Sequence, residues 1–239
     1  MRSYTRHQLK QDSFRTSTTE TISWVVEHQS KLVAAGIVVA VIVAAVLGGW
    51  WYVDYRDQQA QSQLSQAIEK FNAPVRPAGT PATPEMLSFA SSEERAKVTN
   101  AEFTRIADKY SFTQSGRVAR YFAGITFHDM GDNAAAEKAL KDVADSRNKE
   151  VASLAKLALA GIYHDTNRDP QAIALYKDLA DHPTASVGKS AAQFLLASLY
   201  EESHQPDQAR ALYQQMQKES PASPVAQLAS QKLRAMGQR

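Results

Sequence analysis

The feature that most restricts the fold of this chain is a pattern that recurs about every 36 residues in its second half. In each recurrence an alanine is followed four residues later by a large apolar residue. The pairs are Ala136 with Leu140, Ala172 with Tyr176, and Ala209 with Tyr213. An aromatic residue recurs in the same register, at Phe127, Tyr163 and Tyr200. Turn-forming stretches do the same, at 130–132, 166–169 and 204–207. Three kinds of landmark in one register predict repeated helix pairs.

A helix pair of this length cannot bury its apolar stripe alone, so successive pairs are expected to stack into a continuous core. A small residue also recurs in the first helix of each pair, at Gly124, Ala160 and Ala197. A partial fourth match lies upstream, where Phe103 precedes Leu140 by 37 residues. Residues 223–236 are expected to form a terminal helix that covers the last pair. The sequence therefore predicts an all-α solenoid of about three to four helix pairs over residues 92–239.

A second constraint is an uncharged run of 22 residues at positions 32–53. As a helix it would be roughly 33 Å long, which matches a hydrocarbon core of about 30 Å. Aromatic residues that favour the headgroup layer gather at its end: Trp50, Trp51, Tyr52 and Tyr55. A cleaved signal peptide is the alternative, but its apolar region usually spans only about 7–15 residues. We therefore predict one uncleaved transmembrane helix in a lipid bilayer.

The charges beside this segment predict its orientation. Five basic residues precede it: Arg2, Arg6, Lys10, Arg15 and Lys31. Only Arg56 and Lys70 occur in the twenty residues that follow. Because basic flanks stay in the cytoplasm, residues 1–31 are predicted to be cytoplasmic and the large C-terminal part to lie across the membrane.

Small residues recur every fourth position on one face of the predicted span. They are Gly36, Ala40, Ala44 and Gly48. Such a face permits close packing against another membrane helix. The alternative is that Ala and Gly are simply common in this segment.

Residues 54–91 are expected to connect the span to the repeats. The helix should continue to Phe71, with Leu64, Ala67 and Ile68 on the same side. Residues 73–85 contain four prolines and a glycine, which predict a loop or semi-rigid linker. The next helix should run over about 92–109, with Ser91 or Ser92 as its cap and Glu93 and Glu94 in its first turn.

The sequence shows no constellation of residues typical of an enzyme. It has no cysteine and a formal net charge of +2, and no long basic run indicates a nucleic-acid partner. None of its six histidines has the H-E-x-x-H spacing. His128 and His164 occupy equivalent repeat positions, which indicates either a metal or acid–base site or polar residues that close each first helix. Glu201 and Glu202 are expected to form a solvated helix end. We predict no catalytic residue, cofactor, metal or small-molecule substrate.

Protein binding is the better hypothesis for the repeats. The inner face of such a stack is lined by the first helices, and its candidate partner-binding residues are Tyr121, Ile125, Leu157, Phe194 and Glu201. Aromatic and apolar residues there would accept a peptide or a segment of a partner. The alternative is that several of them belong to the core.

The small, aromatic, alanine and large apolar positions together resemble the tetratricopeptide repeat, and Pro221 fits the closing proline of that family. Arg120, Lys156 and Gln193 stand where the family often has Trp or Leu, so this position departs from the pattern.

The whole layout is similar to the YfgM-like family of ancillary subunits of the bacterial SecYEG translocon. This resemblance implies an adaptor in the bacterial inner membrane, with the repeats in the periplasm. Its partners would be the translocon, periplasmic chaperones and emerging secreted chains. The alternatives are a repeat scaffold in envelope biogenesis or cell division, and an accessory domain with hidden enzymatic activity.

Overall fold

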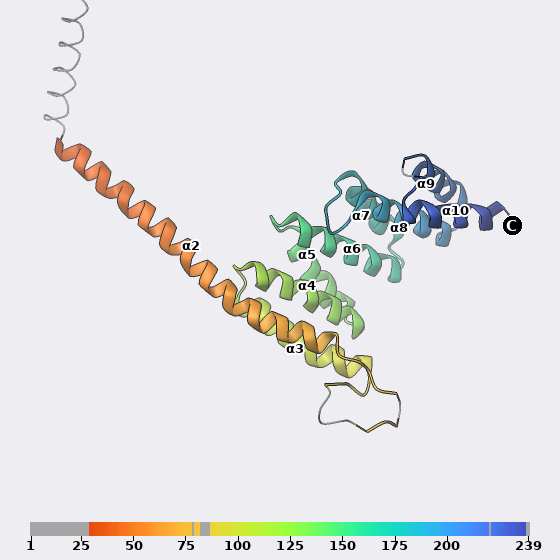
Figure 1. Ribbon diagram of the computed structural model, residues 1–239, viewed down its shortest axis with the longest axis horizontal. Coiled ribbons are helices and arrows are strands. Elements are labelled where there is room, and N and C mark those ends of the chain that lie inside the picture. The colour runs from red at the N-terminus through yellow and green to blue at the C-terminus, as the bar shows by residue number, and fades with distance from the viewer. Residues whose placement is uncertain (1–28, 78, 82–86, 220, 238–239) are drawn as a thin grey trace, which may run out of the picture. The chain divides into compact units, whose positions relative to one another are not determined.

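The computed structural model describes residues 29–77, 79–81, 87–219 and 221–237. Within these ranges the chain forms helices joined by turns and loops, and its only β-type pairing is an isolated bridge between Val75 and Phe89 (Figure 1). This architecture confirms the predicted all-α class. Contacts divide the chain into two units, Met1–Tyr55 and Arg56–Arg239, and each unit is considered by itself below.

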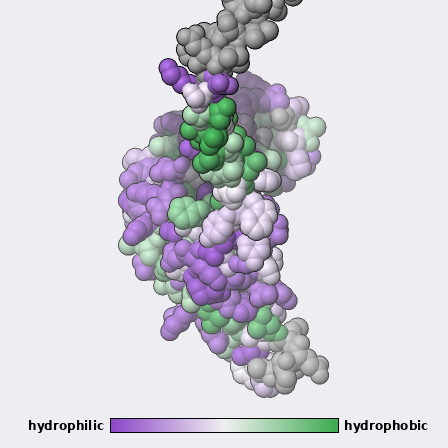
Figure 2. All heavy atoms as spheres, turned by 90° about the vertical axis from the view of Figure 1, so that its left-hand side faces the viewer, coloured by the Kyte–Doolittle hydropathy of each residue, from purple (hydrophilic) through white to green (hydrophobic). Residues whose placement is uncertain are grey.

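The first unit contains the beginning of helix α2 (Gln29–Phe71). Its described large apolar side chains are exposed, with exposed fractions from 41% at Val53 to 70% at Trp50. In Figure 2 these residues form a continuous hydrophobic patch that ends in paler aromatic rings. The structure thus confirms a helix long and apolar enough to span a membrane. Of the predicted cytoplasmic segment 1–31, all but the last three residues lie outside the described part of the chain.

The second unit begins with the end of α2, which packs against α3 (Ser92–Lys109) and α4 (Gln114–Asp129). Ala60, Leu64 and Ala67 are buried on this side of α2, as the sequence pattern indicates for the last two. This part of α2 therefore acts as the first helix of an additional pair, and α3 acts as the second. The proline-containing segment between them is the connection within that pair.

That connection is tied together where it is described. The backbone N–H of Arg76 donates to the carbonyl oxygen of Phe89 at 2.8 Å. The backbone N–H of Phe89 donates to the carbonyl oxygen of Pro74 at 3.1 Å. Helix α3 then begins at the expected place, because the Ser91 hydroxyl accepts from the backbone N–H of Glu94 at 3.0 Å. The described residues of the proline-rich stretch are not helical, as their composition predicts.

Three further pairs follow, and they confirm the predicted repeats. They are α4 with α5 (Asn133–Ala144), α6 (Lys149–Asp165) with α7 (Asp169–Asp181), and α8 (Lys189–Glu202) with α9 (Pro206–Glu219). Helix α10 (Pro224–Gly237) packs on α9 and α8 and closes the stack. The repeated alanines Ala136, Ala172 and Ala209 are each 0% exposed. Helix packing explains the small residue in the first helix, because a Cβ added to Gly124 would lie 2.6 Å from Cγ of Leu140.

Each of these pairs turns at a residue with positive φ, and these residues keep the same register. They are Gly131, Asn167 and His204, with φ of 80°, 57° and 58°. The next residue donates its N–H to the carbonyl of the recurring aromatic residue. The bonds run from Asp132 to Phe127, Arg168 to Tyr163, and Gln205 to Tyr200, at 2.9, 2.7 and 2.8 Å. Such bonds satisfy carbonyls left open at a helix C-terminus, so the spacing between aromatic and turn follows from backbone geometry.

Among the described residues, the buried apolar side chains form two groups. One joins α2, α3 and α4 and includes Phe103 and Tyr110, which are 0% and 2% exposed. The other runs through the remaining helices. Val118 and Phe127 of α4 pack against both groups, so the apolar interior continues from one pair to the next, as a stacked repeat requires.

Candidate functional site

The candidate site is the face formed by the first helices of successive pairs. Tyr121 of α4, Leu157 of α6 and Phe194 of α8 occupy equivalent places, at steps of 36 and 37 residues. All three are half-buried and pack against the main core. The structure therefore brings these predicted residues to matching positions, with each side chain shared between the interior and the surface. Their role in binding a partner stays a prediction.

The aromatic members of this face are held by neighbouring rings. The Tyr121 ring lies 5.3 Å from that of Phe122, and the Phe194 ring lies 5.8 Å from that of Tyr213. Burial raises the pKa of the Tyr121 hydroxyl. Ile125, one turn after Tyr121, is also half-buried. A face of fixed apolar and aromatic side chains suits contact with an apolar segment of another protein, because little side-chain freedom is lost on binding.

Glu201 differs from the other predicted site residues. Its carboxylate oxygen lies 2.9 Å from Nζ of Lys232 in α10 and 3.4 Å from the hydroxyl of Tyr213. The terminal helix therefore engages this carboxylate. The sequence could not show this, because Lys232 lies 31 residues further along the chain.

Two grooves were not foreseen from the sequence. One of about 360 Å³ lies between α2 and α4, and its lining includes Asp57, Gln61 and Val118. The other, of about 480 Å³, is lined mainly by α6, α7 and the turns beside them, and includes Lys149 and His182. Their residues share no sequence signature, because the grooves arise from the spacing of helices.

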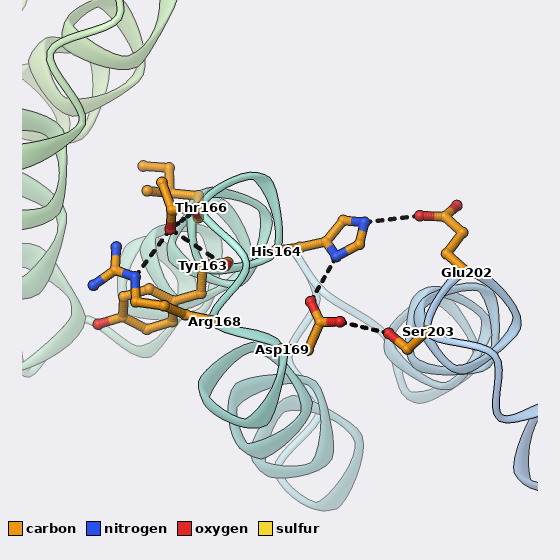
Figure 3. A network of polar contacts seen from close by, with 8 residues as sticks. Tyr163, His164, Thr166, Arg168, Asp169, Glu202 and Ser203 are labelled. Atoms are coloured by element: carbon orange, nitrogen blue, oxygen red, sulfur yellow. Dashed lines mark hydrogen bonds and ion pairs between the residues drawn. The ribbon is translucent and has the colours of Figure 1, made fainter.

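Polar contacts join the α6–α7 pair to the α8–α9 pair at one point (Figure 3). Nδ1 of His164 lies 2.8 Å from Oδ1 of Asp169, and Nε2 of His164 lies 2.8 Å from Oε2 of Glu202. The Ser203 hydroxyl donates to Oδ2 of Asp169 at 2.6 Å. His164 and Asp169 belong to one helix pair and Glu202 and Ser203 to the next. The network therefore links adjacent repeats.

The same arrangement recurs one repeat earlier. Nδ1 of His128 lies 2.8 Å from Oδ1 of Asn133, and Nε2 of His128 lies 3.3 Å from Oδ2 of Asp165. Among the residues that the structure describes, no group of His, Asp and Glu is arranged to hold a metal ion. Both histidines instead make contacts that close a first helix and connect it to the next pair. Glu202 is exposed, as expected for a helix end, and its carboxylate also meets His164.

This network predicts a pH dependence. The hydrogen bond to Asp169, aided by Glu202, raises the pKa of His164 above its ordinary value, despite some desolvation. A raised pKa contributes stability that is fully present below the unfolded-state pKa of about 6.5 and is lost as pH rises through the folded-state pKa. We expect a His164→Gln variant to differ most from the parent chain in urea midpoint at about pH 5.5, and least at about pH 8.5.

The bond from His164 lowers the pKa of Asp169, so this carboxylate stays ionised between about pH 5.5 and 8.5. His164 is therefore the group of this pair whose protonation changes over that range. A difference in midpoint that stays constant, or grows as pH rises, would contradict this assignment of charge.

The positions that depart from the tetratricopeptide pattern also have a structural explanation. Arg120 reaches Asp142 at 3.4 Å, and Lys156 reaches Asp178 at 2.6 Å, so each cation joins the two helices of its own pair. The bond from Lys156 lowers the pKa of Asp178. At the third equivalent position Gln193 is only 5% exposed. At two of these three positions, therefore, an ion pair between the paired helices stands where the repeat pattern often has Trp or Leu.

The small residues predicted to pack helices in the membrane lie in the first unit. Gly36, Ala40, Ala44 and Gly48 are all exposed, and a Cβ added to either glycine would meet no atom within 4 Å. They remain candidates for contact with another membrane helix.

The geometry defines the class of this protein as a helical-repeat scaffold that also carries a helix apolar enough to span a membrane. The chain belongs to the family described as "Tetratricopeptide repeat-like domain", whose model matches residues 23–238. No curated protein and no solved structure matches the chain significantly. The family and the fold are typical of non-enzymatic protein-interaction scaffolds, which supports protein partners for this chain.

Proposed function

We propose that this chain is a membrane-anchored adaptor that binds proteins beside the SecYEG translocon and links secretion to periplasmic chaperoning. The observation that carries the proposal is the row of half-buried residues Tyr121, Leu157 and Phe194 on successive first helices. The same chain contains a helix suited to a membrane. An adaptor of this kind would hold emerging secreted chains or chaperones close to the site where secreted chains leave the membrane.

The proposed location is the bacterial inner membrane, with residues 1–31 in the cytoplasm and the repeats in the periplasm. The excess of basic residues before the span supports this orientation. A reporter fused after Arg239 should be active on the periplasmic side. Activity only in the cytoplasm would contradict the orientation.

The binding face can be tested by photo-cross-linking in living cells. A photoreactive phenylalanine analogue is placed at Tyr121, Leu157 or Phe194, one position at a time, in the full-length chain. Matched controls carry it at exposed positions on the second helices of the same pairs: Lys138, Lys177 and Gln214. We expect the first-helix positions to capture translocon subunits, periplasmic chaperones or secreted chains, and the controls to capture few.

Equal capture from both sets of positions would show that the first-helix face is not the binding site. Capture of division or outer-membrane assembly proteins alone would favour a scaffold in envelope biogenesis or cell division. Copurification from gently solubilised membranes, followed by mass spectrometry, provides an independent check on the identity of the partners.

A further inference from the structure

Phe112 is unusual among the apolar side chains of the second unit. Its side chain is 85% exposed, whereas Leu87 and Leu228 are 50% and 46% exposed. It lies in the connection between α3 and α4, next to the buried residues Tyr110 and Thr113. A single exposed hydrophobic residue is common on protein surfaces, so its position must decide whether it has a role.

The turn that carries Phe112 is fixed internally. The backbone N–H of Thr113 donates to the carbonyl oxygen of Tyr110 at 2.9 Å, and the Thr113 hydroxyl donates to the same oxygen at 2.9 Å. Tyr110 and Thr113 are 2% and 3% exposed. Both residues are therefore anchored in the core, while Phe112 between them faces the surroundings.

Both ends of this turn are attached to the first residues of the second unit. Nη2 of Arg56 donates to the carbonyl oxygen of Lys109 at 2.8 Å, and the N–H of Ser115 donates to Oδ1 of Asp57 at 2.8 Å. The Arg56 guanidinium also lies 4.7 Å from the centre of the Tyr110 ring. Phe112 is three residues from each attachment point, so its backbone lies within about 10 Å of Lys109 and Ser115, and within about 13 Å of the Arg56 and Asp57 side-chain atoms that bind them.

The chain itself relates these residues to the bilayer. Arg56 follows Val53, the last residue of the uncharged segment, by three positions in the same helix, a rise of about 4.5 Å. The headgroup layer on each side of a bilayer is about 5–7 Å thick. A span that ends at Val53 therefore places Arg56 and Asp57 among the headgroups, and the turn attached to them is within reach of the same layer.

We propose that the turn between α3 and α4 is a membrane-contact element, in which Phe112 inserts at the boundary between lipid headgroups and acyl chains. Aromatic rings favour this boundary. Arg56 and Lys109, at one end of the turn, carry charges suited to lipid phosphates. The contact would give the repeat stack a second point of attachment to the lipid surface, besides the spanning helix. This inference rests on the proposed membrane anchor.

The absence of natural cysteines makes a direct test possible. The full-length chain is reconstituted in vesicles of phosphatidylcholine and phosphatidylglycerol, with an environment-sensitive fluorophore attached to a Phe112→Cys variant. The control is Arg147→Cys, an exposed position in the corresponding connection between α5 and α6. Lipids that carry a nitroxide close to the headgroup should quench the label at position 112 several-fold more strongly than the label at position 147.

A second measurement keeps the natural side chain. Amide hydrogen exchange of the 110–113 segment is compared between the parent chain and Phe112→Asp, both in lipid nanodiscs. We expect several-fold faster exchange in the variant, and no change in the 145–148 segment.

The outcomes separate the contact from the anchor. Labelled protein that floats with the vesicles but is quenched equally at positions 112 and 147, or equal exchange in parent chain and variant, would overturn the contact alone. Protein that fails to float would overturn both the contact and the anchor.

Discussion

Replacing Gly116 with alanine is expected to lower the free energy of unfolding by about 3 kcal/mol or more. Gly116 is buried in the first turn of α4, and a Cβ added there would lie 1.9 Å from the carbonyl oxygen of Tyr110. That oxygen belongs to the backbone and accepts two hydrogen bonds from Thr113, so it cannot move aside without disturbing the turn. The clash should outweigh the gain of about 1 kcal/mol that alanine usually brings to a helix interior.

The measurement is urea unfolding of the full-length chain in mild detergent, followed by far-ultraviolet circular dichroism. Gly161→Ala is the matched control, because Gly161 also lies within a helix, α6, but a Cβ there would meet no atom within 4 Å. Its stability should be unchanged or rise by up to about 1 kcal/mol. If both variants change the free energy of unfolding by similar amounts, helix propensity, and not the contact with Tyr110, determines the effect of alanine at position 116.

The repeat register could be read from the sequence because it reflects constraints that act within one helix pair. Ala136 and Leu140 share one face of α5, and the turn that precedes them needs a residue that accepts positive φ. The same applies at each later pair. Helix α3 was also predictable, since Ser91 and Glu94 mark its start in the local sequence alone.

The first pair was harder to recognise from the sequence. Its first helix is the end of α2, which runs on directly from the apolar segment. The long connection before α3 then displaces it from the register of 36 or 37 residues. The domain boundary expected at residue 92 follows that register, whereas the contacts in the structure begin a unit at Arg56.

Contacts between repeats could not be derived from spacing. His164 meets Glu202 across 38 residues, and Glu201 meets Lys232 across 31. Such pairs depend on how one helix pair rotates against the next, which a repeat pattern does not specify. For the same reason the pattern could place Tyr121, Leu157 and Phe194 on equivalent helical turns, but could not predict how much of each side chain is buried.

Phe103 should be the most sensitive residue of the first pair. Its ring is fully buried, lies 5.0 Å from that of Phe122 in α4 and 6.1 Å from that of Phe71 in α2. Loss of a buried Phe side chain typically costs about 3–5 kcal/mol, and here it would also remove the ring that joins three helices. We expect Phe103→Ala to lower the stability by this amount and to speed amide exchange in residues 56–71 more than in α8 and α9.

Phe112→Ala removes the same side chain from the surface, where it is 85% exposed, so it should change the unfolding free energy in detergent by no more than about 0.5 kcal/mol. Comparing Phe103→Ala with Phe112→Ala separates the effect of burial from the effect of losing a phenylalanine ring. If Phe103→Ala hardly changed the free energy of unfolding, the end of α2 would not depend on this core for its stability. Faster exchange spread evenly over all the pairs would mean that the repeats unfold as one cooperative unit, and not as a stack whose first pair can open separately.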